Sequence, residues 1–144
     1  MTPTLFGRLQ TRIFLIAVIG SLWTLIVTPF LPGGGTTSER YEGTFAVLAV
    51  VLVAGLAWEL LYHFLQQFRW EKDWPTFFGF LTGINEGVLV WILVSAGLAP
   101  GDPVVPGSTF TVHFVTTWLV TFMFVIGPIR LFMIRYRFRG GRLV

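Results

Sequence analysis

Four long apolar stretches divide the sequence, and they limit the folds that are open to it. They cover about 13–31, 45–67, 77–98 and 110–134. A transmembrane helix needs about 20 predominantly apolar residues to cross a hydrocarbon core about 30 Å thick. Only 12% of the residues are charged, whereas a typical soluble domain has about 25%. We therefore predict an all-α integral membrane protein, with four transmembrane helices in a single domain over residues 1–144.

The connections between the apolar stretches are short, so we expect consecutive helices to be antiparallel neighbours. Lys and Arg residues in short cytoplasmic segments set the orientation of such a protein. Of the 10 Lys and Arg residues, all except Arg40 fall at the N-terminus, in the second connection, or at the C-terminal end of the fourth stretch and beyond. We therefore predict a multi-pass protein of the cell membrane with both termini in the cytoplasm.

Four ionisable side chains interrupt the apolar stretches: Glu59, His63, Glu86 and Arg130. A charged side chain at the centre of a span costs about 2.5–3.5 kcal/mol on insertion scales, so such residues are candidates for function. With a helical rise of about 1.5 Å per residue, Glu59 lies roughly 12 Å and Glu86 roughly 15 Å from the cytoplasmic edge. We expect the four side chains to gather as a polar cluster in the cytoplasmic half of the bundle.

Several interpretations of this polar cluster are open. In the structural one, Arg130 pairs with a carboxylate, or Glu86 is protonated and bonded to a neighbouring helix. In a transport function, Glu59 and Glu86 bind a proton or a cation. A quinone or a lipid headgroup could also bind between the helices.

We predict no metal site and no cofactor. Glu59, His63 and Glu86 are too few ligands for a di-metal site, and Glu59 and His63 are four residues apart rather than three. His63 and His113 are the only histidines, and they fall near opposite faces of the membrane. A single haem iron within this chain therefore cannot take both as ligands.

The third apolar stretch contains two consecutive GxxxG steps, formed by Gly79, Gly83 and Gly87. Small residues at this spacing let two helix backbones approach closely. We interpret the three glycines as a helix-packing ridge. Its partner is either another helix of this chain or a neighbouring protein, which includes a second copy.

The C-terminal segment interleaves basic and aromatic residues directly after the fourth stretch. Its arginines are Arg135, Arg137, Arg139 and Arg142. Basic residues near a membrane surface are attracted to anionic lipid headgroups by about 1 kcal/mol each. We expect these arginines to contact such headgroups or an acidic partner, and we expect no nucleic acid, because they form no separate binding domain.

No catalytic motif is present in the sequence. There is no G-x-S-x-G, Walker loop, H-E-x-x-H or dinucleotide fingerprint, and there is no cysteine. We therefore expect a non-enzymatic protein: a small accessory or structural subunit of a larger membrane protein complex. The alternative is a small oligomeric transporter or proton-coupled channel that uses the intramembrane carboxylates.

Overall fold

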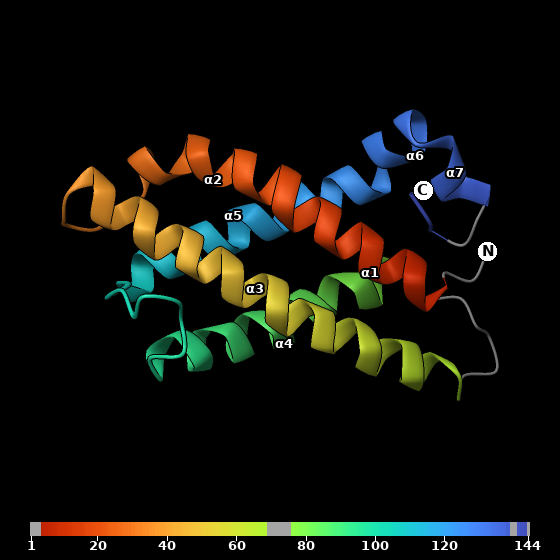
Figure 1. Cartoon of the computed structure of the whole chain (residues 1–144), viewed down its shortest axis with the longest axis horizontal. Coiled ribbons are helices and arrows are strands. Elements are labelled where there is room, and N and C mark those ends of the chain that lie inside the picture. The colour runs from red at the N-terminus through yellow and green to blue at the C-terminus, as the bar shows by residue number, and fades with distance from the viewer. Residues whose placement is uncertain (1–3, 69–75, 139–140, 144) are drawn as a thin grey trace.

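The computed structural model describes residues 4–68, 76–138 and 141–143, and the regular structure in this part of the chain is helical throughout. Figure 1 shows the helices side by side in an elongated bundle. In chain order they are α1 (Leu5–Phe14), the π-helical η1 (Leu15–Gly20), α2 (Ser21–Val27), the 3-10 turn η2 (Thr28–Phe30), α3 (Thr37–Gln66), α4 (Thr76–Ser95), α5 (Gly107–Ile126), α6 (Pro128–Phe132) and α7 (Ile134–Phe138).

Within the described residues, three helical runs are long and apolar enough to cross a membrane: Leu5–Phe30, Thr37–Gln66 and Gly107–Phe132. The first joins α1, η1, α2 and η2, and the third joins α5 and α6. Within α4, Gly79–Ser95 forms a shorter apolar helix. The prediction of a multi-pass helical membrane protein is confirmed at this level.

The first two helical runs begin about eight residues before the predicted spans, and polar caps explain the difference. The Thr4 hydroxyl accepts a hydrogen bond from Gly7 N–H at 3.2 Å. Thr36 and Glu39 form a reciprocal capping box at the start of α3. Such caps satisfy the free N–H groups of a first turn and let a helix start among polar residues. As a result, Arg8 and Arg12 lie inside the first helical run.

The third and fourth spans also differ from their predicted ends, 98 and 134, because of glycine and proline. The helix α4 stops at Ser95, and Gly97 follows in the left-handed region with φ +73°. Leu98 N–H returns to Leu93 O at 3.1 Å, which closes the helix end. The helix α5 ends at Gly127 (φ −111°, ψ −88°), directly before Pro128. Proline lacks the N–H that would continue the helical hydrogen bonds.

The helical runs alternate in direction along the chain. The start of α1, the end of α3 and the short helices α6 and α7 lie at one end of the bundle, and the connections 31–36 and 96–106 lie at the other (Figure 1). The helix α3 contacts α1, α2, α4 and α5, so it is central to the packing. A buried cluster joins η1, α3, α4 and α5, and it includes Ile16, Val47, Val51, Val90, Phe110 and Phe114.

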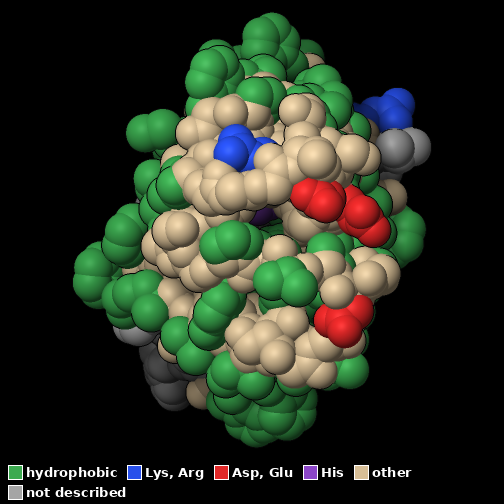
Figure 2. Space-filling model, turned by 90° about the vertical axis from the view of Figure 1, so that its left-hand side faces the viewer, with side chains coloured by type: hydrophobic (Ala, Val, Ile, Leu, Met, Phe, Trp, Pro, Cys, Tyr) green, Lys and Arg blue, Asp and Glu red, His purple; other side chains and the backbone are tan. Residues whose placement is uncertain are grey.

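The two ends of the bundle differ in charge. Figure 2 looks onto the end with the connections 31–36 and 96–106, where a few acidic and basic side chains lie among backbone and uncharged polar atoms, with hydrophobic side chains around them. Glu39, Glu42 and Asp102 are exposed there. Arg40 donates hydrogen bonds to the carbonyl oxygens of the turn after η2, Leu31 O among them at 3.3 Å. The helices α6 and α7 and the start of α1, which carry arginines, lie at the opposite end (Figure 1).

Candidate functional site

Two arginines of α1 point toward α3 and α4 from positions one helical turn apart. Arg8 Nη1 lies 3.2 Å from Glu59 Oε2, and Arg8 Nη2 donates to Gln66 Oε1 at 2.5 Å. The side chains of this ion pair are only 12% and 21% exposed. Residues four apart share one face of a helix, so Arg8 and Arg12 are presented together. The Arg8 contacts fasten the start of α1 to the end of α3.

The second arginine, Arg12, reaches across α3 to α4. Its Nη2 forms an ion pair with Glu86 Oε1, and the two side chains are 16% and 5% exposed. The same nitrogen lies 3.4 Å from the carbonyl oxygen of Val51 in α3. The guanidinium passes directly over Gly55, where a Cβ atom would overlap with it. Arg12 therefore links three helices through one buried charge pair, and that link depends on the missing side chain at Gly55.

The polar side chains predicted from the sequence are only partly brought together. Glu59 and Glu86 meet two neighbouring arginines of α1. His63 lies one turn beyond Glu59 and is partly buried. Arg130 belongs to α6 and is exposed. The sequence contains a signal for the pairing of Arg8 and Arg12 with these carboxylates. Two carboxylates in apolar helices need two cations at a similar depth, and Arg8 and Arg12 have the four-residue spacing that places them on one helix face.

A second polar cluster lies in the other half of the bundle, around His113 of α5. His113 Nε2 is 2.9 Å from Thr24 Oγ1. Thr28 Oγ1 donates to Thr24 O at 2.6 Å and lies 3.0 Å from Thr44 Oγ1. These four side chains are all buried. The contacts join the first helical run to α3 and α5, and their signal in the sequence is the four-residue spacing of Thr24 and Thr28.

The three glycines of the α4 ridge face aromatic side chains of α5. A Cβ atom at Gly83 would overlap with Trp118, and one at Gly87 would lie 2.7 Å from Phe114 Cε1. Gly79 has more room, with the nearest side-chain atom, in Phe122, at 3.5 Å. The rings of Trp118 and Phe122 stack with centroids 4.9 Å apart. In this structure the ridge thus packs against the chain's own α5.

After the break at Gly127, the chain folds back onto α1. Thr11 Oγ1 donates to Gly141 O at 3.0 Å, and Leu143 N–H donates to Gln10 Oε1 at 3.1 Å. These contacts hold the C-terminal segment at the same end of the bundle as the Arg8–Glu59 pair.

The arginines of the C-terminal segment lie on the outside of this end. Arg135 and Arg142 are exposed, and the Arg142 guanidinium lies 5.7 Å from the centroid of the Phe6 ring. The side chain of Arg137 and the whole of Arg139 lie outside the described residues. Burial raises the pKa of the Tyr136 phenol, and the nearby charge of Arg130 opposes that shift. This surface combines positive charge with aromatic side chains.

Within the described ranges, no group of three or more His, Asp or Glu side chains is placed to hold a metal ion. The two polar clusters consist instead of arginine–glutamate ion pairs and of hydroxyl contacts between helices. A comparison with known proteins gives no match: no family model fits the sequence, and neither a curated protein nor a solved structure matches it.

Proposed function

We propose that this protein is a small, non-catalytic accessory or structural subunit of a larger membrane protein complex. The observation that carries the proposal is that both intramembrane carboxylates are paired with arginines of the chain's own first helix. Glu59 and Glu86 are therefore used to hold helices together, which suits a stable scaffold better than a site that exchanges protons or ions.

The proposed topology has four crossings, with both termini in the cytoplasm. The helix α4 has 20 residues, and at about 1.5 Å per residue it is about 30 Å long, the thickness of the hydrocarbon core. The arginine-rich end, which carries Arg130, Arg135 and Arg142, would lie in the cytoplasm because cytoplasmic segments are enriched in basic residues.

Most of the surface that a partner protein could use would lie within the bilayer. The connections 31–36 and 96–106 are short, and large apolar side chains cover the outside of α3 and α4. Val53, Phe64, Ile84, Val88 and Ile92 are exposed there. In lipid such a face is not driven to associate by its hydrophobicity alone, so a partner must provide close packing or hydrogen bonds.

The basic C-terminal segment is the part of the chain best suited to act outside the hydrocarbon core. Arg130, Arg135 and Arg142 are exposed beside the exposed rings of Phe132 and Phe138. Each arginine near an anionic surface contributes about 1 kcal/mol of attraction. We propose that this segment contacts anionic lipid headgroups at the cytoplasmic surface, next to the partner subunits.

A transport function is the alternative, and it makes a different demand on the same residues. Glu59 or Glu86 would have to leave its arginine and bind a proton or a cation during each cycle. This predicts a flux in proteoliposomes that the substitution Glu86→Gln abolishes. An unchanged flux in that variant would exclude Glu86 as the transport site.

The proposed function is tested by isolating the tagged protein from its native membranes in a mild detergent. We expect larger membrane proteins to be recovered with it in fixed stoichiometry, and to be absent from a parallel preparation of untagged cells. Recovery as a stable monomer, or as an oligomer of this chain alone, would contradict the proposal. The second of these outcomes would favour the transport alternative.

A further inference from the structure

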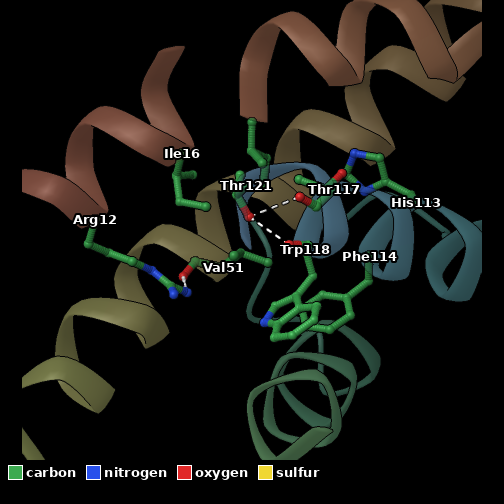
Figure 3. A pocket seen from close by; sticks show the side chains of 9 residues that line it. Arg12, Ile16, Val51, His113, Phe114, Thr117, Trp118 and Thr121 are labelled. Atoms are coloured by element: carbon green, nitrogen blue, oxygen red, sulfur yellow. Dashed lines mark hydrogen bonds between the residues drawn. The ribbon is translucent and has the colours of Figure 1, made fainter. Parts of the chain in front are cut away.

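A small cavity of about 20 Å³ lies between the two polar clusters of the bundle. Figure 3 shows Arg12 at one side of it and His113 at the other, with Thr117 and Thr121 of α5 between them. Ile16 of η1 also lines the cavity. Turns of π-helix are rare and are frequently found at functional sites, and η1 lies beside this cavity.

Three residues that line this cavity have a buried polar atom without a hydrogen-bond partner among the described residues: Arg12 Nε, His113 Nδ1 and Thr117 Oγ1. His113 and Thr117, which are 1% and 4% exposed, are neighbours on α5. The other ring nitrogen of His113 already contacts Thr24. Buried polar groups are almost always hydrogen-bonded, to protein or to ordered water. His113 Nδ1 and Thr117 Oγ1 therefore point to a bound ligand that supplies the missing hydrogen-bond partner.

The neighbouring Thr121 gives a useful contrast. It lines the same cavity, but its hydroxyl donates to the carbonyl oxygens of Thr117 and Trp118, each at 3.0 Å. Its hydrogen-bonding capacity is met by its own helix. Thr117, one turn earlier on the same face, has no such contact in the described part of the chain, so its hydroxyl needs a partner from the cavity.

The small size of the cavity limits the ligand to a molecule about as large as water. A buried water needs about 10–15 Å³ of space measured in this way, and two to four polar partners. The cavity of about 20 Å³ therefore has room for one water molecule. We propose that it holds an ordered water that is hydrogen-bonded to His113 Nδ1 and Thr117 Oγ1. Because water both donates and accepts, it fits either neutral tautomer of His113.

This water would extend the polar contacts of one half of the bundle toward the other. The contacts from Thr44 through Thr28 and Thr24 end at His113, and Arg12 begins the ion pairs beyond the cavity. With the water in place, a polar seam runs along the inside of an otherwise apolar bundle. The seam fixes how the first helical run and α5 are rotated against each other.

The proposal is tested by water-edited solid-state NMR on the full, isotope-labelled chain in lipid bilayers. This experiment follows the transfer of magnetisation from water protons to individual residues. We expect the signals of His113 and Thr117 to build up several-fold faster than the signal of Val90, which is fully buried away from the cavity. Build-up at the rate of Val90 would overturn the proposal, because the cavity would then be dry.

A matched pair of variants provides the second measurement. The substitution Thr117→Val should reduce the transfer from water to His113 several-fold and lower the melting temperature, because it removes a partner of the water. Thr121→Val should leave the transfer to His113 unchanged. A rise in melting temperature for Thr117→Val would contradict the proposal, since it would mean that the native hydroxyl is buried without any partner. If Thr117→Val does not fold, the wild-type comparison with Val90 still decides.

Discussion

Replacing Glu86 by glutamine removes one partner of the most buried ion pair in the described part of the chain. The substitution keeps the shape of the side chain but removes the carboxylate that is paired with the Arg12 guanidinium. Breaking a buried pair in this way costs about 3–5 kcal/mol. Because native proteins are stable by only about 5–15 kcal/mol, this is a large share of the total. At about 2–4 °C per kcal/mol, the melting temperature should fall by about 6–20 °C.

The assay is thermal unfolding of the purified protein in mild detergent, followed by tryptophan fluorescence. The control is Glu42→Gln, which removes an exposed carboxylate at the other end of the bundle and should change the melting temperature little. The double variant Arg12→Met with Glu86→Met removes both charges and should recover most of the loss. The reasoning is refuted if Glu86→Gln has the same melting temperature as the control. It is also refuted if the loss of melting temperature in the double variant equals the sum of the losses in Arg12→Met and Glu86→Met.

Three further predictions follow from the packing. The substitution Gly55→Ala should displace the guanidinium that crosses α3 and lower the melting temperature nearly as much as loss of the ion pair, whereas Gly34→Ala, with open space around it, should not; equal melting temperatures would contradict this. Gly83→Ala should cost about 1–3 kcal/mol in a denaturation experiment by overpacking against the α5 indole, while Gly79→Ala should be tolerated, and the reverse order would be wrong for this packing. Because the chain has no cysteine, Ser38→Cys should react with an impermeant maleimide on intact cells, whereas a cysteine added after the C-terminal residue should react only after permeabilisation; the opposite pattern would invert the proposed topology.

The sequence predicts the helices well because a long apolar stretch without charges has few other solutions in lipid. Its weakness is at the helix ends. Hydropathy starts the first span at Ile13, but the cap at Thr4 lets the helix begin at Leu5. That shift turns Arg8 and Arg12 from flanking residues into the ion-pair partners of Glu59 and Glu86. The start of the first helix therefore also decides which cations face Glu59 and Glu86.

The partners of the buried polar groups depend on how each helix is rotated, and this is a property of tertiary packing. The sequence identifies Glu59 and Glu86 as unusual, but it does not show which cation faces them. Arg130 was a reasonable choice from its depth alone. The break at Gly127 places Arg130 in the short helix α6 rather than in α5. The missing side chain at Gly55 gives Arg12 its path to Glu86. Neither effect is visible in a pattern of apolar residues.

The most direct test of the proposed accessory function is site-specific photocrosslinking in the native cells. A photoreactive amino acid is placed in turn at the exposed positions Val53, Ile84 and Ile92, with the buried Val90 as the control. The proposal predicts crosslinked products of defined mass with another membrane protein at one or more of the exposed positions, and none at Val90. Exposed positions that crosslink only to lipid, or only to a second copy of this chain, would contradict it.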